Sequence, residues 1–194
     1  ERKLGPEDFG GADFEGCNEH LVLTRPDVIR EIHESYLKAG ADILETNTFG
    51  STKRVLAEYP PLQEKAYEIT RAAASLAREA ADRFSTPDKP RFVAGSMGPT
   101  TKAISVTGGI TFEELIENFK EQAKALAEGG ADYFLLETAQ DTRNIKAGLI
   151  GIHQYLEQSG LTLPIAVSGT IEAMGTMLAG QTVEALAISL AHED

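Results

Sequence analysis

Segments with helical spacing of apolar residues alternate with short apolar runs along most of the chain. Helices are expected over residues 24–39, 51–59, 63–84, 111–130, 142–160 and 182–193. Between them lie the runs 41–45, 91–96, 133–137 and 164–169, which suit strands buried on both faces. This alternation predicts βαβ units on a parallel sheet with right-handed crossovers. The first 23 residues lack such a pattern and are expected to be irregular.

Capping residues mark several of these boundaries. Thr24 is the expected N-cap of the helix over 24–39, with Pro26 in its first turn. Gly40 suits a left-handed residue at the end of the same helix. Thr111 and Glu114 have the spacing of a capping box, which predicts a helix start at that point.

Two helix-to-strand junctions repeat one phrase. Residues 36–46 read YLKAGADILET, and residues 126–138 read LAEGGADYFLLET. In both, Gly-Ala-Asp ends a helix and opens a strand that closes on Glu-Thr, at Glu45 and at Glu137. We interpret the repeat as a helix end followed by entry into a strand, which recurs because βα units recur. We expect the two carboxylates at the same height on their strands.

The strand ends favour a barrel over a doubly wound sheet. A dinucleotide-binding sheet would carry G-x-G-x-x-G after its first strand, and the sequence has no such motif. Polar residues follow the strands directly, and in a barrel these ends converge on the catalytic face. We therefore expect an α/β fold of the (β/α)8 TIM-barrel family, as a single domain over residues 1–194. Only four strands are visible, so the barrel is expected to be partial, without its first and last strands.

Composition narrows the classes of partner. The net charge of −12 disfavours nucleic acid and anionic membranes, and no apolar run is long enough to span a bilayer. A single cysteine, Cys17, excludes an internal disulfide and a cysteine cluster for metal built by this chain alone. None of the four histidines has another histidine four residues away. We expect a cytoplasmic protein, with no metal ligand and no catalytic residue assigned.

The two strand-end glutamates are the strongest chemical candidates. Glu137 follows an apolar run, and a buried carboxylate without a cation is costly, so it is expected to meet one. A ligand ammonium and a side chain such as Arg143 or Lys146 are both compatible with the pattern. Glu45 could bind an ammonium group or a metal, act as a base, or only brace the loop at Asn47 and Thr48.

Longer sequence segments of the chain resemble those of a known family. They are NEHLVLTRPDVIREIHESYLKAGADILETNTFGST (18–52), FVAGSMGPT (92–100), GGADYFLLETAQDTRNIKAG (129–148) and PIAVSGTI with LAGQTVEAL (164–186). In this order they are similar to the homocysteine-binding module of cobalamin-dependent methionine synthase. More distant relatives are betaine–homocysteine and other homocysteine S-methyltransferases.

The resemblance implies a barrel that presents a zinc-bound homocysteine thiolate for methyl transfer from methylcobalamin, giving methionine. It implies that Glu137 holds the homocysteine ammonium. The remaining substrate-binding residues that it implies are Asn47, Thr48, Ser168 and Thr170. Methylcobalamin would be carried by another module, and the implied partners are the cobalamin-binding and folate-binding modules of the same parent protein.

The chain also departs from the family pattern. The family's opening Asp-Gly-x-Met-Gly-Thr motif and its zinc-binding cysteines do not occur in this chain. Cys17 matches none of those cysteines. We therefore expect this chain alone to be inactive and to bind no stoichiometric zinc. Two alternatives stay open: a cobalamin-independent homocysteine S-methyltransferase that uses betaine or S-methylmethionine, and a non-catalytic truncated barrel fragment.

Overall fold

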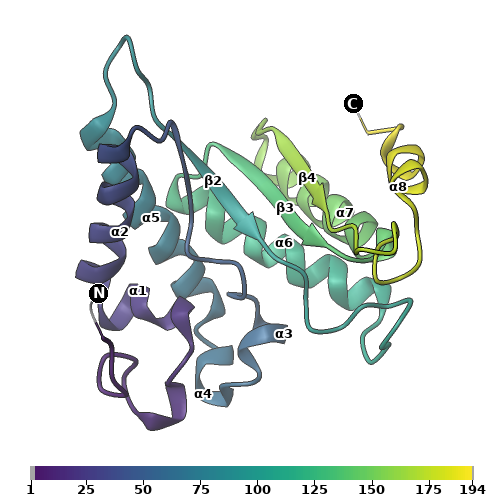
Figure 1. Cartoon of the computed structure of the whole chain (residues 1–194), viewed down its shortest axis with the longest axis horizontal. Helices are drawn as coiled ribbons and strands as arrows, with labels where there is room; N and C mark the ends of the chain where they lie inside the picture. The colour runs from purple at the N-terminus through teal and green to yellow at the C-terminus, as the bar shows by residue number, and fades with distance from the viewer. Residues whose placement is uncertain (1–2, 194) are drawn as a thin grey trace.

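A computed structural model describes residues 3–193 and has the expected alternation of helices and parallel strands (Figure 1). The strands are β1 (Ile43–Glu45), β2 (Phe92–Met97), β3 (Tyr133–Ala139) and β4 (Ile165–Gly169). The long helices are α2 (Pro26–Ala39), α5 (Ala66–Phe84), α6 (Phe112–Gly129), α7 (Thr142–Ser159) and α8 (Val183–Leu190). Short helical turns are η1 (Ala12–Phe14), η2 (Asn18–His20), α1 (Leu21–Thr24), α3 (Lys53–Leu56) and α4 (Pro60–Gln63).

The four strands form one parallel sheet in the order β1-β2-β3-β4. Each crossover carries helices, and α5, α6 and α7 lie together behind the sheet in Figure 1. The described residues therefore form two layers, a sheet and a row of helices that covers one of its faces. This is the arrangement that successive right-handed βαβ units produce.

The main core lies between the sheet and these helices. The strands contribute Leu44, Val93, Met97, Phe134 and Leu136, all at most 3% exposed. They pack against small and branched side chains of α5, α6 and α7, including several alanines. A second apolar cluster joins α5 to the N-terminal turns and contains Cys17, which is 1% exposed.

The helix caps agree with the sequence in two places and differ in one. Gly40 ends α2 with φ 107°, and Thr111 and Glu114 complete both bonds of the capping box. Thr24, however, is not an N-cap: it ends α1, and Arg25 precedes α2. Proline disfavours helical dihedrals in the residue before it, so the break falls on Arg25, immediately ahead of Pro26.

Other boundaries also shifted. The first 23 residues are not wholly irregular, because η1, η2 and most of α1 lie there. The segment expected as a helix over 51–59 is the short helix α3, which Thr52 caps by accepting a hydrogen bond from the Val55 amide. None of the helices in residues 3–193 is long and apolar enough to cross a membrane.

Candidate functional site

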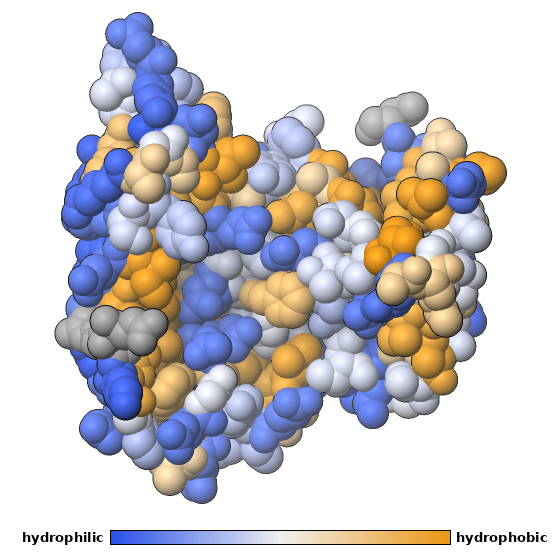
Figure 2. Space-filling model, in the orientation of Figure 1, coloured by the Kyte–Doolittle hydropathy of each residue, from blue (hydrophilic) through white to orange (hydrophobic). Residues whose placement is uncertain are grey.

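Within residues 3–193, one face of the sheet is not covered by helices (Figure 1). Side chains alternate along a strand, so the residues next to the buried core positions point to this open face. Ile43 and Phe92 mark it with exposures of 48% and 44%. The alternation also places on it Glu45, Ala94, Ser96, Tyr133, Leu135, Glu137, Ala166 and Ser168. The molecule is hollowed on the face drawn in Figure 2, where hydrophilic and hydrophobic residues lie side by side.

Glu137 is the half-buried carboxylate of this open face. Its Oε1 accepts a hydrogen bond from the hydroxyl of Ser96 on β2. Within residues 3–193 it forms no ion pair, and neither Arg143 nor Lys146 forms a hydrogen bond with it. The structure thus leaves one carboxylate oxygen without a hydrogen-bond partner from the described chain.

The backbone beyond Glu137 is strained. Thr138 has φ 55°, a left-handed conformation that is uncommon for residues other than glycine, and the β3–β4 register shifts between Leu136 and Ala139. Such irregularities re-aim side chains at the end of a strand and occur often at functional sites. The strain therefore lies directly beside the candidate carboxylate.

Glu45 does not stand at the height of Glu137, which corrects the expectation from the repeated phrase. The register pairs Glu45 with Ala94 and Ala94 with Tyr133, so Glu137 lies four residues further along its strand. Burial raises the pKa of the Glu45 carboxyl, and repulsion from Glu137 adds to the rise. Glu45 is exposed and, in the part of the chain described, has no hydrogen bond or ion pair that braces the next loop.

Asn47 and Thr48 both bond to other segments of the chain, and only Thr48 is buried. The Asn47 side-chain amide donates to the carbonyl of Asn18, at 2.8 Å. Thr48 is fully buried, and its hydroxyl donates to the carbonyl of Ser96, at 2.6 Å. The structure therefore places both residues at the junction of β1 with its neighbours, and it does not bring their side chains to Glu137.

Ser168 and Thr170 lie at the end of the strand next to Glu137. Ser168 is exposed on β4, on the face opposite Gly169. The Thr170 amide donates to the carbonyl of Ala139 at 2.9 Å, which extends the β3–β4 ladder past Glu137. These two residues and Glu137 therefore share one corner of the sheet.

A long loop over residues 98–110 is fastened beside this corner. Asp141 caps α7 and also accepts bonds from the Ser105 amide and hydroxyl, at 2.8 and 3.1 Å. Asn144 accepts from the Ile104 amide and donates to the carbonyl of Lys102. These two anchors were not predicted from the sequence, although Asp before Thr at a helix start is a recognisable cap signal.

The described residues do not fit a zinc site. Among residues 3–193 no three His, Cys, Asp or Glu side chains gather closely enough to hold a metal ion. Cys17 is buried in the second apolar cluster, where burial raises its thiol pKa and disfavours the thiolate that zinc requires.

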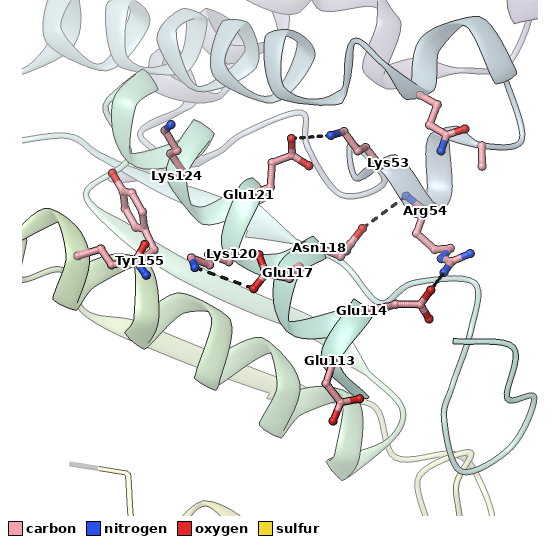
Figure 3. A pocket seen from close by; sticks show the side chains of 13 residues that line it. Lys53, Arg54, Glu113, Glu114, Glu117, Asn118, Lys120, Glu121, Lys124 and Tyr155 are labelled. Atoms are coloured by element: carbon pink, nitrogen blue, oxygen red, sulfur yellow. Dashed lines mark hydrogen bonds and ion pairs between the residues drawn. The ribbon is translucent and has the colours of Figure 1, made fainter. Parts of the chain in front are cut away.

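A large cavity lies elsewhere, on the outer surface of the helices. It has a volume of about 910 Å³ and is lined by α3, α6 and α7 (Figure 3). Its charges are largely paired, as in Lys53 with Glu121 at 2.9 Å and Arg54 with Glu114 at 3.5 Å. Because the charges of this cavity are largely paired and no strand ends line it, it has fewer groups free to bind a ligand than the open face of the sheet.

Comparison with known proteins agrees with this fold. The sequence profile of the family described as Homocysteine S-methyltransferase matches residues 2–194. The fold is similar to crystal structures of the homocysteine methyltransferase MmuM from Escherichia coli. The oxidized form has 21% identity and a TM-score of 0.74 over 91% of this chain, and the metallated form has 22% and 0.73 over 88%.

The chain spans 62% of the length of the first of these structures and 61% of the second. At this level of identity the structural likeness establishes the fold, an α/β arrangement with a parallel sheet. The family assignment rests on the profile, which covers nearly every residue. The chain belongs to the homocysteine S-methyltransferase family.

Proposed function

We propose that this chain is the homocysteine-binding part of a cobalamin-dependent methionine synthase. In this proposal the open face of the sheet receives homocysteine. Methylcobalamin would supply the methyl group: the homocysteine sulfur would lose its proton and gain the methyl, and the cobalt–carbon bond would break to leave cob(I)alamin and methionine. The sheet order is that of four adjacent strands, which we assign as strands two to five of an eight-stranded barrel, in one domain over 1–194. The cobalamin-binding and folate-binding modules would be parts of the same parent protein, in the cytoplasm.

The observation that carries the proposal is the state of Glu137. It is half-buried, its Oε1 is held by Ser96, and it has no cationic partner in the described chain. A carboxylate in such a position is stabilised by a cation that brings its own hydrogen-bond donors. The ammonium group of an amino acid supplies both. Ser168 and Thr170 lie at the same corner and would line the pocket. Asn47 and Thr48 would support it through their bonds to neighbouring segments.

The ligand can be tested by calorimetry with L-homocysteine on the full-length protein. Replacing Glu137 by Gln should weaken binding on the order of 100-fold, because a charged hydrogen-bond partner of the ammonium is lost. Glu157→Gln, an exposed carboxylate on α7, is the matched control and should bind like the wild type. Equal affinities for Glu137→Gln and the wild type would overturn the assignment.

Zinc is proposed to be held by residues outside this sequence, because the described residues do not fit a site for it. Metal analysis of the 194-residue chain should therefore find no stoichiometric zinc. One tightly bound zinc ion per chain would contradict this part of the proposal.

A second candidate function is a cobalamin-independent homocysteine methyltransferase. The likeness to the MmuM structures, which are named as homocysteine methyltransferases, favours it. Methyl transfer by the full-length protein with methylcobalamin, S-methylmethionine or betaine separates the two. Product with methylcobalamin alone supports the first candidate, and product with either of the other donors supports the second.

A further inference from the structure

Ser96 is fixed between two strands by both its backbone and its side chain. It is 2% exposed and belongs to β2, and its hydroxyl donates to Oε1 of Glu137 on β3. The Ser96 amide donates to Thr46 Oγ1 at 3.0 Å, and its carbonyl accepts from Thr48 Oγ1 at 2.6 Å. Its backbone is thus tied to the end of β1, while its side chain is tied to β3.

Counting protons gives the direction of every bond in this group. The single hydroxyl proton of Thr48 goes to the Ser96 carbonyl, so the 2.6 Å contact between Thr46 and Thr48 must use the proton of Thr46. The bonds from Ser96 to Thr46, from Thr46 to Thr48 and from Thr48 to Ser96 form a closed ring. Thr46 and Thr48 are 4% and 0% exposed, so water does not compete for the ring, and its bonds strengthen one another.

Every proton of the ring is already used in a bond within the ring. The proton of the Ser96 hydroxyl, which lies outside the ring, is therefore the one that reaches Oε1 of Glu137. The other oxygen of Glu137 has no hydrogen-bond partner among residues 3–193. The carboxylate is therefore held at one oxygen and open at the other, on the uncovered face of the sheet.

We propose that Ser96 is a positioning residue that orients the Glu137 carboxylate toward the ammonium group of the amino-acid substrate. This inference rests on the proposed homocysteine-binding function. Ser96 does not touch the ligand: it prevents rotation of the carboxylate, and the ring of Thr46 and Thr48 keeps Ser96 in place. The ligand class is an α-amino acid with a free ammonium group.

The test compares L-homocysteine with its des-amino analogue by calorimetry on the full-length protein. Ser96→Ala should weaken homocysteine binding about tenfold and leave the des-amino analogue unchanged. In a Glu137→Gln background, Ser96→Ala should have no further effect, because Ser96 acts through that carboxylate. Ser51→Ala is the matched control, since Ser51 is a buried serine that bonds to the Thr48 carbonyl and not to Glu137.

The outcomes separate the two proposals. If the wild type binds no homocysteine, or binds the des-amino analogue equally well, the proposed function fails and this inference with it. If Glu137→Gln abolishes the preference for the ammonium but Ser96→Ala does not reduce it, only the positioning role is overturned. A loss for both ligands in Ser96→Ala and Ser51→Ala alike would show general damage to the fold and would also overturn that role.

Discussion

The two junctions that share the Gly-Ala-Asp phrase begin alike and end differently. Gly40 and Gly130 both end a helix in the left-handed region, with φ 107° and 99°. Beyond them β1 has three residues and β3 has seven. In the described part of the chain, Glu45 is exposed and has no hydrogen bond or ion pair at the end of β1, whereas Glu137 is half-buried and bound to Ser96 near the end of β3. The shared sequence therefore forms the same helix-to-strand junction twice, and the neighbouring strands determine the burial and bonding of each carboxylate.

The Thr that follows each Glu shows the same divergence. Thr46 is buried, and its hydroxyl joins the ring with Thr48 and Ser96. Thr138 is instead strained, at φ 55°, where β3 loses register with β4. One threonine thus locks its strand to the next, and the other marks the point where the ladder is irregular. Strain of this kind is kept where the surrounding structure supports it.

The largest expected contrast concerns the Asp of the phrase. Asp132 accepts bonds from Arg78 at 2.8 Å and from the Val93 amide at 2.7 Å, whereas Asp42 is 67% exposed and pairs with Arg91. Asp132→Ala should cost about 2 kcal/mol of unfolding free energy, and Asp42→Ala less than about 1 kcal/mol. Urea denaturation of both variants measures the difference. Equal losses would mean that the two junctions are energetically equivalent.

The glycines should show a smaller contrast. A Cβ on Gly130 would lie 2.9 Å from the Arg78 side chain, whereas a Cβ on Gly40 would meet nothing within 4 Å. Gly40→Ala should cost about 1 kcal/mol, which is the left-handed strain alone, and Gly130→Ala about 1.5 kcal/mol. Thermal unfolding of the pair tests this order, and a costlier Gly40→Ala would reverse it.

The smallest effect is expected at Glu45. Its pKa is raised in the folded state by burial and by repulsion from Glu137, so the folded chain holds this proton to higher pH than the unfolded chain. The resulting destabilisation is absent in acid and develops as the pH rises through the folded-state pKa. Glu45→Gln should therefore stabilise the protein near neutral pH by no more than about 0.5 kcal/mol, given its exposure. The gain should vanish in acid, and a gain that persists there would have another cause.

Local signals predicted much of the fold. The glycine stops, the capping box at Thr111 and the four apolar runs each depend on a few neighbouring residues, and the structure contains all of them. The prediction of Thr24 as the N-cap was wrong because the restriction that Pro26 places on the backbone of Arg25 outweighs the capping preference of threonine. The family resemblance was also confirmed by the profile match.

The arrangement of the site depends on contacts that no local pattern encodes. Ser96 and Glu137 are 41 positions apart, and their contact depends on the register of β2 with β3. The lengths of the apolar runs do not specify that register, so Glu45 and Glu137 were expected at one height. The burial of Thr48 depends likewise on a strand 48 positions away. The substrate roles of Glu137, Asn47, Thr48, Ser168 and Thr170 stay predictions.

The attachment of the 98–110 loop to Asp141 has a consequence for local unfolding. The same carboxylate caps α7 at the Arg143 amide and holds the loop at Ser105. Removing this carboxylate would release the Ser105 attachment and uncap the first turn of α7 at the same time. The loop and the start of that helix are therefore coupled through one side chain, and we expect their local stabilities to change together.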